Sequence, residues 1–236
     1  MVASNERNPK YFVETADMMF SLAGVVRSTL DVSVEFINLG GGLGTPYRPE
    51  QKAISPDEVA RPIAGLYNTL NEGGLSPKVF MENGRFVTGP HGYLVTTVLH
   101  VMRKYKDYVG ADATMANLMR PGMYGSYHHI TVLGKGGEIK GHVYDVVGSL
   151  CENTDKFAIN RSLPKISPSD VLVIHNVGAH GHAMGYNYNG KLRSAEFMSN
   201  LFGQARMIRR PETTSDYFAT LAGFDGSRFG QLANRN

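Results

Sequence analysis

The sequence is poor in cysteine: its 236 residues contain a single one, Cys151. Because one copy of the chain cannot form an internal disulfide, we expect packing alone to hold the fold, and a reducing, cytoplasmic compartment. Long apolar runs are also missing. Residues 1–10 are polar, and no stretch reaches the roughly 20 apolar residues that a membrane span needs. These absences argue against secreted and membrane proteins.

An excess of positive charge is missing as well. The 24 Lys and Arg residues against 21 Asp and Glu residues give a net charge of +3, with no basic block, so a nucleic-acid-binding protein is not indicated. With 42% hydrophobic and 19% charged residues, the chain can bury a large core, which excludes a disordered or collagen-like protein.

The first hundred residues alternate between helix and strand patterns. Apolar residues at helical spacing predict a helix over 11–30, and a β-rich run predicts a strand over 32–39. Ser55 is expected to begin a second helix, with Glu58 completing a capping box, and 78–82 reads as the next strand. This order is typical of an α/β protein with parallel strands.

The rest of the chain is richer in strand patterns. We expect a first domain over 1–104, and a β-rich domain with a closing helix near 211–221 over 105–236. The clearest strand patterns of the second part are 130–133, 138–147 and 171–177.

Two strand ends carry groups that could bind an anion. The first strand runs into Gly40, Gly41 and Gly42, whose backbone N–H groups could form a phosphate nest, although a tight glycine turn would look the same. The second strand runs into a loop of residues 82–85, which could also be a solvated loop. Because successive strands of an α/β barrel end at one face, we expect the two loops to meet.

Further residues could carry chemistry on the β-rich side. Arg120 and Tyr124 could bind a carboxylate, but such a pair is more often a structural surface pair. Cys151 has acidic neighbours, which disfavour a thiolate, so it reads either as a proton donor or as buried filler. The histidines, such as His128, His129 and His175, have no spaced acidic partner, and we expect no metal site.

Several segments, in this order, resemble the fold-type III pyridoxal-phosphate decarboxylases, most closely those that act on diaminopimelate. The matching segments are 37–47, 82–85, 120–124, 151–155, 188–189 and 209–213. The resemblance implies that pyridoxal phosphate is the cofactor. It further implies that the cofactor is held by Gly40, Gly41, Gly42, Glu82, Asn83, Gly84, Arg85 and Tyr188. Asn83 stands where the family has proline.

The resemblance also implies roles for the substrate-binding residues Arg85, Arg120, Tyr124, Glu152 and Tyr188. Arg85 would hold a substrate carboxylate, and Glu152 would recognise the distal amino group of the substrate. Cys151 would donate the proton after decarboxylation, across a dimer interface. The implied reaction converts meso-diaminopimelate to lysine, in lysine biosynthesis.

The implied fold is an α/β plus β chain: an incomplete (β/α)8 barrel portion followed by a Greek-key β-barrel-like domain. The family's Schiff-base lysine lies well before the glycine loop, and no lysine here matches it. The chain therefore resembles the second half of such an enzyme, expected to be inactive alone and to form a homodimer or to bind a complementing N-terminal half. Two alternatives stay open: a decarboxylase of another basic amino acid, and a non-catalytic assembly or anion-binding partner.

Overall fold

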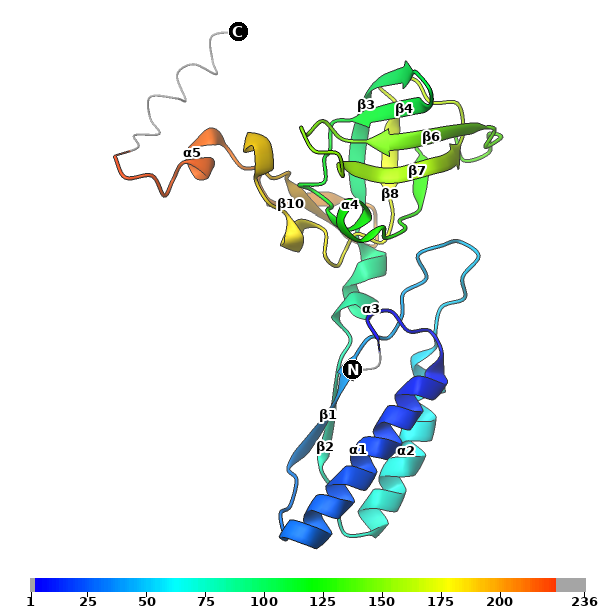
Figure 1. The fold of residues 1–236 in the computed structure, drawn as a ribbon, viewed down its shortest axis with the longest axis vertical. Helices are drawn as coiled ribbons and strands as arrows, with labels where there is room; N and C mark the ends of the chain where they lie inside the picture. Colours follow the sequence, from blue (N-terminus) through cyan, green and yellow to red (C-terminus); the bar gives the residue numbers. More distant parts are fainter. Residues whose placement is uncertain (1–2, 224–236) are drawn as a thin grey trace. The chain divides into compact units, whose positions relative to one another are not determined.

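The computed structural model describes residues 3–223, and the chain divides between Gly92 and Tyr93 into two compact units (Figure 1). Each unit has a buried apolar cluster of its own. Within residues 3–223, no helix is both long and apolar enough to cross a membrane.

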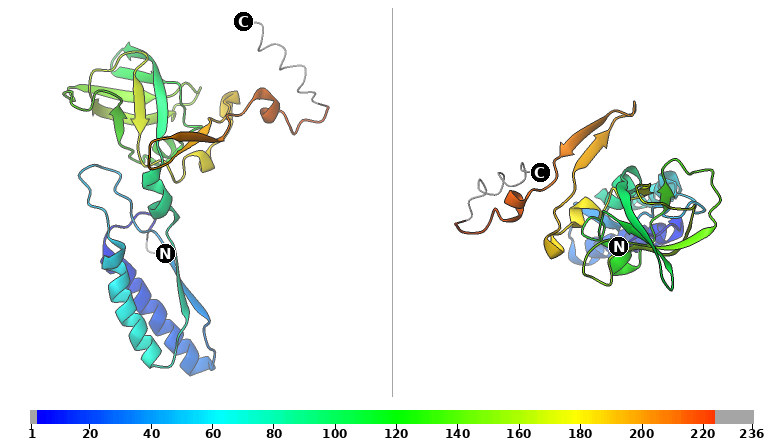
Figure 2. Two further views of the ribbon diagram at one scale, coloured as in Figure 1. Left: turned by 180° about the vertical axis from the view of Figure 1, so that it is seen from behind. Right: turned by 90° about the horizontal axis from the view of Figure 1, so that it is seen from above.

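The first unit consists of two helices on one face of a two-stranded parallel sheet, as Figures 1 and 2 show. Its elements are α1 (Pro9–Leu30), β1 (Phe36–Gly41), α2 (Pro56–Glu72), β2 (Lys78–Glu82), the one-turn helix α3 (Gly84–Thr88) and the 3-10 turn η1 (Gly89–His91). The predicted first helix and second strand are confirmed.

Local signals explain both ends of α1. The side chain of Asn8 caps the first turn by accepting a hydrogen bond from the Lys10 N–H at 3.1 Å. Asp31 ends the helix in the left-handed conformation, at φ 55°. Between them, one apolar stripe is buried against the sheet and α2: Phe12, Ala16, Phe20 and Ala23.

Two local predictions need correction. The first strand covers Phe36–Gly41 rather than 32–39, because its partner β2 begins at Lys78, which pairs with Phe36. Ser55 does cap α2, but its side chain makes no capping hydrogen bond. The Glu58 N–H instead donates to the Ser55 carbonyl at 3.1 Å, so the predicted capping box does not form.

The two faces of the β1–β2 sheet differ. On one face, Ile37 and Leu39 are buried in the cluster formed with α1 and α2. On the other face, Phe36 and Phe80 meet edge to face, with ring centroids 5.9 Å apart, and remain 58% and 50% exposed. Parallel strands are usually covered on both faces.

The second unit is built on a six-stranded mixed sheet that curls around its own core (Figure 1). In the order β5-β8-β3-β4-β6-β7, all neighbours pair antiparallel except β4 and β6, which are parallel. The strands are β3 (Leu94–Arg103), β4 (Asp107–Ala111), β5 (Ile130–Val132), β6 (His142–Val147), β7 (Lys156–Leu163) and β8 (Val171–Ile174). A β-barrel-like sheet is thus present, but its parallel pair departs from a purely antiparallel Greek key.

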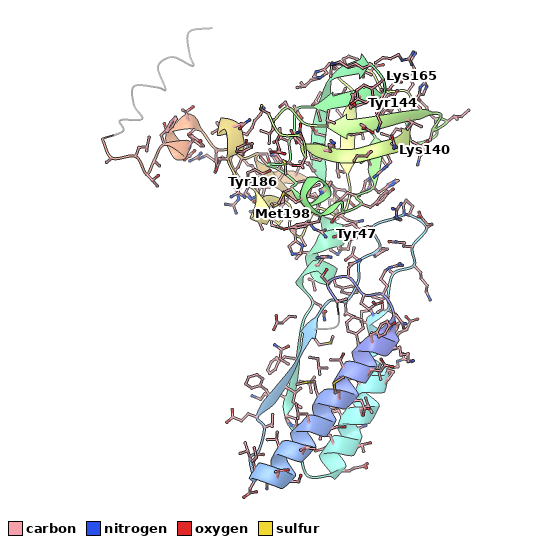
Figure 3. The ribbon with its side chains drawn as sticks, viewed as in Figure 1. Tyr47, Lys140, Tyr144, Lys165, Tyr186 and Met198 are labelled. Atoms are coloured by element: carbon pink, nitrogen blue, oxygen red, sulfur yellow. The ribbon has the colours of Figure 1, made fainter. Side chains whose placement is uncertain are left out.

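Shorter elements complete the second unit. They are α4 (Arg120–Tyr124), the 3-10 turns η2 (His182–Met184) and η3 (Tyr188–Gly190), the hairpin of β9 (Glu196–Ser199) and β10 (Ala205–Arg209), and α5 (Thr214–Tyr217). The expected closing helix is therefore a single turn. Tyr144, labelled in Figure 3, belongs to the buried cluster of the sheet, and its hydroxyl accepts a hydrogen bond from the Ile166 N–H at 3.3 Å.

Candidate functional site

The two loops of the first unit that are predicted to bind an anion lie side by side. β1 and β2 are parallel: Phe36 lies opposite Lys78, and after a register shift between Asn38 and Gly41, Gly41 lies opposite Glu82. Gly40, Gly41 and Gly42 therefore adjoin the loop that begins at Glu82. The prediction that the two loops share one end of neighbouring parallel strands is confirmed.

Two asparagine side chains hold these loops together. Asn38 accepts a hydrogen bond from the Gly40 N–H at 2.8 Å and donates to a carboxylate oxygen of Glu82. Asn83 accepts a hydrogen bond from the Leu43 N–H at 3.2 Å. Sequence reasoning gave Asn38 no role, although an asparagine inside a strand, directly before a glycine run, is a signal for such a local bond.

The glycines of the loops are required for different reasons. A Cβ on Gly41 would lie 1.9 Å from the Glu82 carbonyl oxygen, and Gly42 adopts φ +105°. Close packing and conformation thus account for these two. Gly84, in contrast, has no protein atom within 4 Å of its Cβ position and no positive φ. Open space in front of Gly84, at the first turn of α3, is what close approach of a ligand would require.

In the second unit, the predicted substrate-binding residues lie on three segments. Arg120 and Tyr124 begin and end the one-turn helix α4, where Arg120 is buried and Tyr124 is exposed. Cys151 and Glu152 lie on the β6–β7 loop, both exposed, which shows that the interpretation of Cys151 as buried filler is wrong. Tyr188 begins η3 and is 48% exposed.

Backbone contacts bring these segments together. A Cβ on Gly122, within α4, would lie 2.2 Å from the Thr154 carbonyl oxygen of the β6–β7 loop. The Tyr186 N–H donates to the Ala116 carbonyl at 3.3 Å, which joins the segment before Tyr188 to the segment before α4. Figure 3 labels Tyr186 on this part of the chain.

A buried carboxylate lies at the centre of this arrangement. Asp155 accepts hydrogen bonds from the Met115 N–H at 2.6 Å and the Leu150 N–H at 2.8 Å. Burial raises the pKa of Asp155 above its ordinary value, while these two N–H groups oppose the rise. From the sequence, Asp155 is predicted only as an acidic neighbour of Cys151; its pairing with Met115, 40 positions away, leaves no local signal.

The pKa values of Glu152, on the β6–β7 loop, and of Tyr186, between η2 and η3, are shifted in opposite directions. Glu152 accepts hydrogen bonds from the Thr154 N–H at 3.0 Å and the Thr154 hydroxyl at 2.9 Å, which lower its pKa. Burial, together with the charges of Asp155 and Glu152, raises the pKa of Tyr186. At neutral pH the loop therefore presents the ionised carboxylate of Glu152, and the phenol of Tyr186, on the segment between η2 and η3, is neutral.

The histidines form hydrogen bonds within the second unit. His128 is fully buried, and its Nδ1 lies 2.9 Å from the His175 carbonyl oxygen. The His175 Nε2 lies 2.9 Å from the Thr131 hydroxyl, and burial lowers the pKa of His175. Across residues 3–223, no three histidine, cysteine or acidic side chains converge in a way that could hold a metal ion.

Comparison with protein families gives a match over residues 7–178, to the model described as "Pyridoxal-dependent decarboxylase, C-terminal sheet domain". Protein TabA of Pseudomonas amygdali pv. tabaci is 43% identical over 223 residues, which cover 92% of this chain and 51% of that protein. Diaminopimelate decarboxylase of Methanothermobacter thermautotrophicus is 39% identical over 217 residues, covering 91% of this chain and 50% of that protein.

Among solved structures, diaminopimelate decarboxylase from M. jannaschii in complex with L-lysine matches with a TM-score of 0.85 and 31% identity. The match covers 92% of this chain and 49% of that one. This chain thus spans about half the length of the relatives it matches.

Proposed function

Because this chain belongs to the pyridoxal-dependent decarboxylases that share a C-terminal sheet domain, we propose that it provides the second half of a cytoplasmic enzyme that converts meso-diaminopimelate to lysine with pyridoxal phosphate. The observation that carries the proposal is the pairing of Gly41 with Glu82, which joins two glycine loops at one end of parallel strands. Relatives named diaminopimelate decarboxylase support the substrate.

The cofactor's phosphate fits the paired loops of the first unit. Gly84 leaves open space for close approach to backbone N–H groups, and the first N–H groups of α3 have no acceptor within the helix. Asn38 and Asn83 fix the two loops against each other. We assign Gly40, Gly41, Gly42, Glu82, Asn83, Gly84 and Arg85 to phosphate binding, and Tyr188 to contact with the cofactor.

The exposed face of the first unit supports the proposed barrel. Phe36 and Phe80 lie on the face opposite the helices, which in a (β/α)8 barrel is the interior. Further parallel strands would cover these two rings. The first unit is then the later portion of a barrel, and a complementing half or a second copy supplies what surrounds it.

In the proposed reaction, this chain's own residues bind the substrate and deliver a proton. Pyridoxal phosphate, when bound, supplies the electron sink for the electrons released as the α-carboxylate leaves. The guanidinium of Arg85 binds a carboxylate of the substrate, and the Glu152 carboxylate binds the distal ammonium group. The Cys151 thiol then gives its proton to the carbon that has lost the carboxylate.

Arg120, Tyr124 and Tyr188 orient the substrate in this proposal. Their three segments are joined by the contacts of Gly122 with Thr154 and of Tyr186 with Ala116. Orientation of this kind contributes to catalysis because the reacting atoms must be aligned before the proton moves. The enzyme is proposed to be a homodimer, in which Cys151 and Glu152 serve the partner's site.

We expect a polypeptide of these 236 residues to bind pyridoxal phosphate without decarboxylating any substrate. The reason is the position of the lysines in the described part of the first unit, none of which is expected to react with the cofactor. Lys10 and Lys52 form ion pairs with Glu14 and Glu58, and Lys78 lies at the opposite end of β2 from the glycine loops. The absorbance spectrum, the unfolding temperature with cofactor and the release of carbon dioxide are measured for the chain alone. They are then measured after addition of a lysine-bearing amino-terminal half from a relative.

The combined halves should release carbon dioxide from meso-diaminopimelate faster than from lysine or ornithine. Turnover by the chain alone would contradict the assignment of the reactive lysine to another half. Binding of inorganic phosphate without turnover in any combination would favour the alternative of a non-catalytic, anion-binding partner. A preference for ornithine or lysine would favour a decarboxylase of another basic amino acid.

Replacement of Thr154 by Val should move the acidic limb of substrate binding to higher pH. The Thr154 hydroxyl donates to Glu152 and lowers its pKa, so its loss raises that pKa and Glu152 becomes protonated at a higher pH as the solution is acidified. The measurement is the pH profile of kcat/KM for meso-diaminopimelate. Thr154→Ser keeps the hydroxyl and serves as the control; coincident Val and Ser profiles would show that this hydrogen bond is irrelevant to binding.

A further inference from the structure

The carboxylate of Asp155 is buried and bound by backbone groups of two separate segments. Asp155 is only 4% exposed, and its two carboxylate oxygens accept hydrogen bonds from the backbone N–H groups of Met115 and Leu150. We propose that Asp155 is a positioning residue, which fixes the loop carrying Cys151 and Glu152 against the segment that leads into α4. The importance of those two residues rests on the proposed function.

The geometry of the loop shows how one side chain can fix it. The Gly148 N–H donates to the Asp155 carbonyl, and the Asp155 N–H donates to the Glu152 carbonyl, both at 3.1 Å. The Asp155 side chain adds the bond from the Leu150 N–H. The arc from Gly148 to Asp155 is therefore closed at its base, and Cys151 lies at its exposed side.

The second bond of Asp155 reaches outside the loop. The Met115 N–H, 2.6 Å from the carboxylate, belongs to a buried segment of the sheet unit that precedes Arg120. Hydrogen bonds to an ionised acceptor are stronger than neutral ones, and a buried carboxylate without donors would be costly. The Asp155 side chain thus ties the loop with Cys151 to the segment before Arg120, in addition to the contact of Gly122 with Thr154.

Gly148 provides an independent test of the same contact. A Cβ at this position would lie 2.3 Å from one Asp155 oxygen and 2.5 Å from the other. Gly148→Ala therefore displaces the carboxylate without removing its charge. Asp155→Asn removes the charge and replaces one acceptor oxygen by a donor, and thus loses one of the two bonds.

Asp145 offers a matched control on the neighbouring strand. It is also buried, at 6% exposed, and accepts hydrogen bonds from the Asn160 N–H at 2.7 Å and the Lys106 ammonium at 3.1 Å. Asp145→Asn therefore weakens a buried carboxylate of the same sheet. Its partners belong to β7 and to the β3–β4 turn rather than to the Cys151 loop.

The experiment uses Cys151 as the reporter, because it is the only thiol of the chain. The rate of its modification by a disulfide reagent is measured for the full chain and each variant, well below the unfolding temperature. We expect Asp155→Asn and Gly148→Ala each to raise the rate about three-fold or more, since loss of a charge-assisted hydrogen bond populates open loop conformations. The double variant should be no faster than the faster single variant.

Two outcomes would overturn the inference. In the first, Cys151 is modified at the parent's rate in both Asp155→Asn and Gly148→Ala. In the second, Asp145→Asn raises the modification rate as much as Asp155→Asn does, which would indicate a general loosening of the sheet unit. Because thiol modification needs neither cofactor nor turnover, this result is independent of the proposed function.

In the complemented enzyme, Asp155→Asn should also raise KM for meso-diaminopimelate and shift the product ratio as Cys151→Ala does. If the thiol rates behave as expected while no combination of halves is active, the proposed function fails and the positioning of the loop stands.

Discussion

Replacement of Cys151 by Ala in the complemented enzyme should lower kcat about 100-fold, because a positioned proton donor contributes roughly 10²- to 10⁴-fold. The thiol is exposed on the β6–β7 loop, as a proton donor to a substrate must be. Without its proton, the carbon that has lost the carboxylate is protonated more slowly and at the wrong position. The share of abortive transamination product should therefore rise.

The measurement for Cys151 is kcat together with the ratio of amine to transamination product. Affinity for pyridoxal phosphate should stay nearly unchanged, since the loops proposed to bind its phosphate belong to the other unit. Cys151→Ser keeps a weaker proton donor and should recover part of the rate. If kcat and the product ratio are both unchanged in Cys151→Ala, another group donates the proton.

Substitution of Gly41 by Ala should cost about 1–3 kcal/mol of unfolding free energy, a range typical of overpacked sites. The added Cβ would lie 1.9 Å from the Glu82 carbonyl oxygen, a backbone atom that cannot move without separating β1 from β2. Because this pairing also aligns the two glycine loops, affinity for inorganic phosphate and for pyridoxal phosphate should fall with it. Urea unfolding and a phosphate titration of the chain measure both effects.

Gly65→Ala is the matched control, since it adds the same methyl group within α2. Its Cβ position has no protein atom within 4 Å, and alanine favours a helix more than glycine does. This variant should gain up to about 1 kcal/mol of unfolding free energy. An unfolding midpoint for Gly41→Ala at or above the parent's would refute the steric argument.

The sequence predicts the first unit well because its signals are local. The apolar stripe of α1, the proline and acidic residues that follow Ser55, and the β-rich run of β2 each specify an element without reference to distant residues. The meeting of the two glycine loops follows from one further rule, that successive parallel strands end on the same side. The bounds of β1 are misplaced because its pairing with the partner strand decides them, and the predicted capping box of α2 does not form.

The second unit is less predictable because its strands are irregular. β7 was missed: Asn160 adopts φ 48° within it, and the register with β6 shifts there, so apolar and polar residues do not alternate. β3 was also missed, and much of its second half is exposed. The hydrogen bonds of Asp155 to Met115, and of Asn38 to Glu82, join residues 40 or more positions apart, and sequence pattern alone gives no means to pair them.

The parallel pairing of β1 with β2 also sets the order in which the first unit acquires its structure. Parallel strands cannot be joined by a tight hairpin, so β1 and β2 are connected by the long span of residues 42–77, which includes α2. Closing that span costs chain entropy before any ladder hydrogen bond compensates it. The packing of α1 against α2 can form earlier, and the loops at the strand ends are then among the last parts of the unit to become ordered. An anion that binds there would slow unfolding more than it speeds folding.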